Sequence, residues 1–293
     1  MSTMHKKCVL FVGFVFMLLC TLSLQAQTLV FSNLTWNVRN GTGGPGPNNW
    51  SSNNAWVDSN GYLHLKITYV NGVWYCPEVS TTTRLGFGQY WFYVIGDVDT
   101  LDPNVVLGLF NYPNPEAGPD GTNEIDIEFS RWGSTSSGAS NASYSVWPNI
   151  LGPNETSLDY TFSLGSGNYS THGFVWKNNR IFFQSGYGHY KTYPYPIMSW
   201  LFTPPDYSTR IPQHTLPVHI NLWLVDGNPP MDGNEVEVII KRFYFTPQAL
   251  LKDCSSGWIE EDLYLEEDLY QEEDCYQEED FCQEEEIFQG NEW

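Results

Sequence analysis

The sequence is poor in positive charge and in helical periodicity. Only 13 of its 293 residues are Lys or Arg, against 34 Asp or Glu, and no basic stripe suits a phosphate backbone. Nucleic-acid binding is therefore excluded. No 12-residue stretch places apolar residues at a convincing period of 3.6, so a helical bundle is excluded as well.

Long hydrophobic runs are also scarce, and the one that stands out lies at the N-terminus. The apolar run 8–22 follows two lysines, and Ala26 offers a small residue at a cleavage point. This layout predicts a secretory signal peptide over residues 1–26 and an extracellular or periplasmic protein without a membrane span. The alternative is a membrane anchor, which needs about 18 or more apolar residues and is disfavoured by the polar Thr21 and Ser23.

Cysteine is sparse, with six in the chain and four beyond the predicted signal peptide. Those four form no C-x-x-C motif or Cys/His cluster, so zinc is not predicted. Three disulfide pairings are open, and none is predicted. Cys76 lies in an apolar stretch and is expected to be a buried thiol.

Aromatic residues, glycine and proline are plentiful, with 18 Tyr, 17 Phe, 12 Trp, 25 Gly and 18 Pro. They occur as short β-type runs between turn residues, which predicts an antiparallel sandwich of two sheets in one domain over residues 27–250. The clearest runs are Tyr62–Val70, Gly88–Ile95, Val105–Tyr112, Glu124–Phe129, Ser143–Trp147, Gly173–Trp176, Arg180–Ser185, His219–Val225 and Val236–Phe245.

The remaining segment, residues 251–293, has a different composition. From Ile259 it repeats a hexad such as IEEDLY, and residues 253–293 hold 17 acids and no Lys or Arg. Six residues do not return to one helix face, so we expect a solvated, disordered tail that is dispensable for catalysis. Weak cation binding and attachment to a basic surface are the alternatives.

The most informative segment is 123–129, in which Glu124, Asp126 and Glu128 alternate with apolar residues. In a strand the three carboxylates share one face. An ordinary strand with one solvated face would also alternate. However, three unneutralised acids repel one another, which suggests that function maintains them. Glycoside hydrolysis is a candidate, because it uses one carboxylate as nucleophile and one protonated carboxyl as acid.

The reading E-I-D-I-E over residues 124–128 resembles glycoside hydrolase family 16, the laminarinase and lichenase family. The order and spacing of further segments agree from about residue 28 to 247. These segments are Gly86–Tyr90, Val105–Phe110, Arg131–Gly133, His172–Trp176, Arg180–Phe183, Asn221–Trp223 and Glu235–Phe245. The resemblance implies an all-β, concanavalin A-like jelly-roll sandwich with a concave glycan cleft.

By the same resemblance, Glu124 is the nucleophile, Asp126 the assisting carboxylate and Glu128 the general acid/base. Asn221 and Trp223 match cleft-lining positions. The chain departs from the family where many members have Glu and Arg after the glycine-rich entry. It has Trp91 and Tyr93 there, so the polar contacts that those two residues make to the sugar in the family are missing.

Sugar rings stack on aromatic faces while their hydroxyls seek polar partners, which selects further binding candidates. Strand parity places Ser143, Ser145 and Trp147 on one side, and His219 on the side of Asn221 and Trp223. The predicted substrate-binding residues are Trp91, Tyr93, Trp132, Ser143, Ser145, Trp147, Asn221 and Trp223. Trp176 is expected in the core, and His172 is expected to be a hydrogen-bonded structural histidine rather than a catalytic base.

These observations favour a secreted, monomeric, retaining endo-β-glycanase acting on β-1,3 or mixed β-1,3/1,4 glucans. The alternative is a non-catalytic glycan-binding or surface protein on the same scaffold. No cofactor is expected to be required. Some similar proteins hold a structural Ca²⁺ through carbonyl groups and an Asp, so such an ion is an expectation, with no ligand assigned.

Overall fold

Short runs of alternating apolar residues fold into strands in this chain, as the sequence predicts. A computed structural model describes residues 27–115, 117–119, 121–148, 156–190 and 195–248, which belong to one unit, Met1–Leu251. Each of the nine runs named above forms a strand, with ends that shift by a few residues. The predicted signal peptide and the whole of the acidic tail lie outside the described residues.

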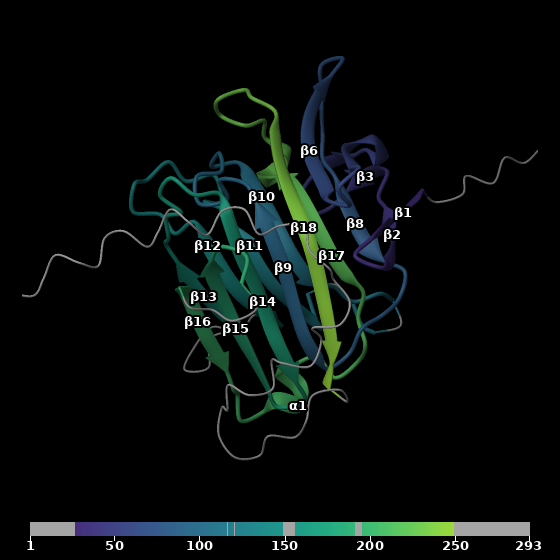
Figure 1. Ribbon diagram of the computed structural model, residues 1–293, viewed down its shortest axis with the longest axis vertical. Helices are drawn as coiled ribbons and strands as arrows, with labels where there is room; N and C mark the ends of the chain where they lie inside the picture. The colour runs from purple at the N-terminus through teal and green to yellow at the C-terminus, as the bar shows by residue number, and fades with distance from the viewer. Residues whose placement is uncertain (1–26, 116, 120, 149–155, 191–194, 249–293) are drawn as a thin grey trace, which may run out of the picture. The chain divides into compact units, whose positions relative to one another are not determined.

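The first sheet is antiparallel and has eight strands (Figure 1). In spatial order they are β1 (Thr28–Phe31), β2 (Leu34–Val38), β8 (Glu78–Thr81), β17 (Val218–Leu224), β10 (Val105–Asn111), β11 (Glu124–Phe129), β12 (Ala142–Trp147) and β13 (Ser157–Tyr160). The acidic strand β11 therefore lies inside the sheet, between β10 and β12.

The second sheet is also antiparallel, and β9 runs beside β14 and β18 near its centre (Figure 1). In spatial order its strands are β16 (Pro196–Phe202), β15 (Arg180–Tyr187), β14 (Tyr169–Lys177), β9 (Gly88–Ile95), β18 (Val236–Pro247), β6 (Leu63–Val70) and β5 (Ala55–Val57). The remaining elements are β7 (Val73–Tyr75), which pairs with β6, the hairpin β3 (Gly41–Gly43) and β4 (Asn48–Trp50), and the short helices η1 (Ser52–Asn54), α1 (Tyr207–Arg210) and η2 (Val225–Gly227).

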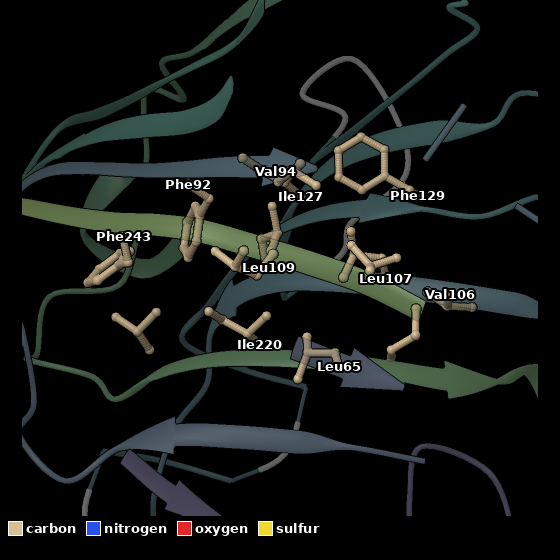
Figure 2. Close-up of a cluster of buried hydrophobic side chains, with 14 of the residues drawn as sticks. Leu65, Phe92, Val94, Val106, Leu107, Leu109, Ile127, Phe129, Ile220 and Phe243 are labelled. Atoms are coloured by element: carbon tan, nitrogen blue, oxygen red, sulfur yellow. The ribbon is translucent and has the colours of Figure 1, made fainter. Parts of the chain in front are cut away.

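The hydrophobic core fills the space between the two sheets. Figure 2 shows Leu109, Ile127 and Phe129 of the first sheet gathered with Phe92 and Phe243 of the second. Direct ring contacts cross the interface: Tyr144 stacks on Phe183 with centroids 4.9 Å apart, and Trp36 meets Phe243 edge-on at 5.7 Å. The predicted fold class, an antiparallel jelly-roll sandwich, is confirmed. Trp176 is fully buried, as expected.

A polar network lies within this core around His172. Its Nδ1 is 2.7 Å from Ser185 Oγ and its Nε2 is 2.8 Å from Ser170 Oγ, while the Tyr144 hydroxyl donates to Ser185 at 2.6 Å. Burial, together with the charge of His189, lowers the pKa of His172 to about 3. The ring is therefore neutral, which agrees with the predicted structural role.

Cys76 is fully buried, and its Sγ contacts Asn48 Oδ1 at 3.4 Å. The predicted buried thiol is therefore confirmed, and burial raises its pKa to about 12, so the thiol is protonated at neutral pH. Within the part of the chain that the structure describes, no helix has the length and apolar character needed to cross a membrane.

Candidate active site

The three acidic side chains of β11 lie on the face of the first sheet that points away from the core. Ile125, Ile127 and Phe129 alternate with them and are fully buried against the second sheet. Because strand residues alternate between faces, burial of the apolar set directs Glu124, Asp126 and Glu128 to the opposite side. We call this side the acidic face.

Pairing with the neighbouring strands determines what surrounds each carboxylate. Trp147 of β12 lies opposite Glu124, Ser145 opposite Asp126, and Ser143 opposite Glu128. The predicted polar partners Ser143 and Ser145 are therefore on the acidic face, together with Trp147. Both serines are buried, and Ser145 Oγ lies 3.1 Å from Ser157 Oγ.

On the other side of β11, Glu128 pairs with Gly108 of β10, and Gly108 pairs with Asn221 of β17. The glycine leaves room for the Asn221 side chain, since a Cβ at position 108 would lie 2.5 Å from Asn221 Oδ1. Asn221 thus occupies the same cross-strand row as Glu128. Asn221 Oδ1 and Asp126 Oδ1 are both buried and have no hydrogen-bond partner among the described residues. A substrate hydroxyl that reached either atom would therefore gain the full energy of a hydrogen bond.

The crowded carboxylates have perturbed acidities. Burial raises the pKa of Asp126 well above its usual value, and the charges of Glu124 and Glu128 raise it further. A hydrogen bond from Trp147 lowers the pKa in part, whereas the hydrogen bond with Glu124 raises it. That last direction is expected when a protonated Asp126 donates to Glu124. Asp126 therefore holds a proton under conditions in which an ordinary aspartate is ionised.

Glu128 is half-buried, and burial raises its pKa to about 7 from an ordinary 4.5. A carboxyl group with this pKa is present in both protonation states near neutral pH, which is the requirement for a residue that first donates and then accepts a proton. The electrostatics of the acidic face thus fit general acid/base chemistry at Glu128.

Two tryptophans predicted to bind substrate meet beside the acidic face. Trp132 and Trp223 contact edge-to-face with ring centroids 5.9 Å apart, and Trp223 is buried while Trp132 is 50% exposed. Trp132 has a φ of 52°, a region that bulky residues rarely adopt, and its N–H donates to Ser130 Oγ at 2.9 Å. The turn after β11 therefore presents an exposed indole next to a buried one.

A groove of about 510 Å³ lies on the same side of the first sheet. It is lined by Asn37, Ser80, Thr81, Thr82, Arg84, Tyr112, Pro113, Asn114, Pro217 and His219. One cross-strand row leads into it from Asp126 through Phe110 and His219 to Ser80 and Asn37. The carboxylates and the polar groove are therefore parts of one surface that crosses five strands.

Solved structures share this architecture. The β-glucanase of Bacillus licheniformis has 22% identity and a TM-score of 0.53, over 73% of this chain and 92% of that chain. A family 16 endo-glucanase from Bacteroides ovatus, in complex with G4G3G-2F-DNP, has 11% identity and a TM-score of 0.54, over 72% and 94%. The fold is that of glycoside hydrolase family 16.

The family 16 fold is not restricted to proteins described as active glucanases. An immunostimulatory antigen and pseudo β-1,3-glucanase of Mycobacterium tuberculosis has 18% identity and a TM-score of 0.53, over 72% of this chain and 91% of that chain. No protein-family model matches the sequence, and no curated protein matches it. The function must therefore be argued from the acidic face itself.

Trp91 and Tyr93 need a correction, because the structure does not bring them to the acidic face. They lie on β9 in the second sheet, where the alternate residues Tyr90, Phe92 and Val94 are fully buried in the core. Trp91 and Tyr93 consequently point outward on the far side of the sandwich. They are removed from the candidate cleft.

The structure adds a buried carboxylate that the sequence did not single out, Glu78 of β8. It pairs with Asn221 in register, accepts from Arg39 Nη1 at 2.6 Å and lies 3.2 Å from His219 Nδ1. Although burial raises the pKa of Glu78, its hydrogen bond with His219 and the charges of His219 and Arg39 outweigh this and lower it. Glu78 therefore places a paired negative charge in the row of Glu128.

The described residues contain no group of three or more His, Cys, Asp or Glu side chains placed to hold a metal ion. The expected structural calcium stays a prediction without assigned ligands.

Proposed function

We propose that this protein is a secreted, retaining endo-β-glycanase that hydrolyses β-1,3 or mixed β-1,3/1,4 glucans. The observation that carries the proposal is the alignment of Glu124, Asp126 and Glu128 on one face, with the pKa of Glu128 raised to about 7. The fold shared with the glucanases of Bacillus and Bacteroides supports the substrate class.

In the proposed first step, the Glu124 carboxylate attacks the anomeric carbon and forms a glycosyl ester. The bond to the leaving oxygen breaks as Glu128 transfers its proton to that oxygen. Glu128 is now a carboxylate, and in the second step it takes a proton from a water molecule. The water oxygen bonds to the anomeric carbon, Glu124 leaves, and the configuration is retained.

Asp126 assists from between the two glutamates. Its protonated carboxyl donates to Glu124, which orients the nucleophile and spares the strand a further negative charge. When Glu124 becomes an ester, the charge that raised the pKa of Asp126 is removed. Asp126 keeps its proton, so the three side chains carry one negative charge both before the first step, on Glu124, and after it, on Glu128.

Neighbouring side chains supply binding. Trp132 and Trp223 provide apolar faces for sugar C–H groups, while Asn221 and Glu78 offer acceptors to hydroxyls. The groove between β2 and β17 gives the polymer a path away from the carboxylates, in keeping with endo cleavage.

The test is hydrolysis by the purified full-length chain of laminarin, lichenan, agar and carrageenan, followed as new reducing ends. We expect cleavage of one or both β-glucans and loss of at least about a thousandfold in rate for Glu124→Gln. Glu237→Gln, at an exposed carboxylate on β18 of the second sheet, is the matched control and should keep the wild-type rate. No release of reducing ends from any β-glycan would refute the enzyme proposal.

A second candidate is a non-catalytic glycan-binding protein on the same scaffold. It is favoured by the likeness to the Mycobacterium protein, whose description as a pseudo-glucanase indicates that the fold occurs without that activity. Binding of β-glucan by wild type and Glu124→Gln with equal affinity, without turnover by either, would decide for this candidate.

A further inference from the structure

The outer face of the second sheet carries a cross-strand row that the proposed cleavage does not use. In register, Tyr244 of β18 lies beside Trp91 of β9, and Trp91 beside Gly173 of β14. The row continues through Gln184 of β15 to Ser199 of β16. We call these residues the aromatic band. Five strands at about 4.8 Å spacing give it a length of about 19 Å.

Trp91 lies flat on the sheet because its partner across the strands is a glycine. A Cβ at Gly173 would be 1.9 Å from Cε3 of Trp91, so the indole covers the backbone of β14 where another side chain would stand. Trp91 is partly exposed on this outer face. Trp91 Nε1 donates to Gln89 Oε1 at 3.3 Å, which helps hold that orientation.

The ring next to Trp91 on β9 is fixed by its neighbours. Tyr93 stacks on His189 with centroids 5.3 Å apart and an interplanar angle of 12°, and it meets Tyr244 edge-on at 5.6 Å. His189 is tied to the strand because its Nε2 donates to the Val94 carbonyl at 2.9 Å. The aromatic side of the band is therefore preorganised, which reduces the entropy lost on binding a ligand.

The charged residues on the strands of the aromatic band indicate which class of ligand it can bind. The strands β9, β14, β15 and β16 contain no Asp or Glu, although the chain carries a net charge of −21. The fifth strand, β18, adds Arg242, which lies 5.3 Å from the centroid of the Tyr244 ring and donates to the Tyr244 hydroxyl. The one acid of β18, Glu237, pairs with His64. An acid-free, aromatic surface that also carries the amide of Gln184 and the hydroxyl of Ser199 suits a neutral, hydroxyl-rich polymer. A second copy of the chain is a poorer fit, since two molecules of this charge repel each other.

We propose that the aromatic band is a second polysaccharide-binding surface, on the opposite side of the sandwich from the acidic face. Its ligand is a neutral β-glucan chain, whose C–H faces stack on Trp91 and Tyr244 and whose hydroxyls bond to Gln184 and Ser199. The choice of β-glucan rests on the proposed function. A binding surface there would hold the protein on the polymer independently of catalysis.

Binding to the polymer is measured by affinity electrophoresis of the full-length chain in gels that contain lichenan or laminarin. Every variant also carries Glu124→Gln, so that the polymer is not cut. We expect Trp91→Ala to weaken binding about fivefold to tenfold and Trp91→Phe to restore most of the affinity. Gln184→Ala removes an amide at little cost in packing and should weaken binding about twofold to threefold. Trp56→Ala is the matched control, because Trp56 is an exposed indole stacked on His64 of the same sheet.

The proposal would be overturned if the Glu124→Gln protein binds the polymer no more tightly than the same protein with Trp91→Ala or Gln184→Ala added. Self-association detected by sedimentation and abolished by Trp91→Ala would overturn it in favour of a second copy. Hydrolysis is measured separately with native Glu124. Absent turnover with Trp91-dependent binding refutes the proposed function alone, whereas turnover with Trp91-independent binding refutes the aromatic band alone.

Discussion

A Cβ atom on Gly108 would lie 2.5 Å from Oδ1 of Asn221, one cross-strand step from Glu128. The absence of a side chain at position 108 thus determines where the Asn221 amide sits. Gly108→Ala should displace that amide and lower kcat/KM by about tenfold or more through misplacement of the bound sugar. Steady-state kinetics on the cleaved glucan measure this, with Gly138→Ala as the control, because a Cβ there meets no atom closer than 4.0 Å. Unchanged kinetics in Gly108→Ala would show that Asn221 does not contact substrate.

The raised pKa of Glu128 predicts how activity depends on pH. The free enzyme needs the protonated form to donate to the leaving oxygen, so kcat/KM should fall about tenfold per pH unit above about 7. A pH–rate profile of kcat/KM from pH 5 to 9 measures it. A plateau that extends past pH 9 would exclude Glu128 as the acid.

The stability of the fold should also depend on the protonation of Glu128. The folded-state pKa of Glu128, about 7, exceeds its ordinary 4.5, so its protonation stabilises the fold fully below about pH 4.5 and this contribution is lost as pH rises through 7. The Glu128→Gln variant has no carboxyl at this position, so it has no such contribution to lose as the pH rises. The Tm of Glu128→Gln relative to wild type should therefore increase from pH 5 to pH 8, by scanning calorimetry. A constant difference would mean that Glu128 is not perturbed.

His172 predicts the opposite dependence in acid. Its folded-state pKa of about 3 lies below the ordinary 6.5, so the unfolded chain binds a proton that the folded chain does not between those values. Stability conferred by the neutral ring is present above about pH 6.5 and is lost as pH falls toward 3, by an amount on the order of a few kcal/mol. His172→Gln, less stable at pH 7 because it disturbs the contacts to Ser170 and Ser185, should lose less stability on acidification. Parallel curves for both proteins in urea titrations would contradict this.

Trp132 predicts a binding effect without a folding effect. Its ring is half-exposed and contacts Trp223, so Trp132→Ala should raise KM about fivefold to tenfold while kcat and Tm change little. Phe at this position should recover part of the affinity. A loss confined to kcat would instead assign Trp132 a role in ordering Glu128.

Much of the fold and the carboxylate cluster could be predicted because both depend on a local period of two. In β11, alternation alone separates Ile125, Ile127 and Phe129 from the acids, and the structure has that separation. The nine predicted strands follow from the same pattern. The edge strand β16, which begins at Pro196, was not among the runs singled out, since proline and a mixed polar pattern weaken the signal.

Alternation does not say which sheet a strand joins, so it could not test the assignment of Trp91 and Tyr93 to the cleft, which rests on the family resemblance. Their outward parity is a local property, but the choice of sheet depends on pairing with β14 and β18. Glu78 illustrates the same limit, because it meets His219 across 141 residues of sequence. Contacts of that kind arise from topology, which the order of residues in one strand does not encode.

The burial of Ile125, Ile127 and Phe129 has a consequence for how this protein tolerates length changes. Deleting one residue within β11 would exchange its two faces, driving carboxylates into a dry interior and isoleucines into water. Removing a residue from the turn that holds Trp132 would leave the alternation of the two faces along β11 unchanged. Insertions and deletions that retune the specificity of this scaffold are therefore confined to the connections between strands, while the acidic strand accepts substitutions only.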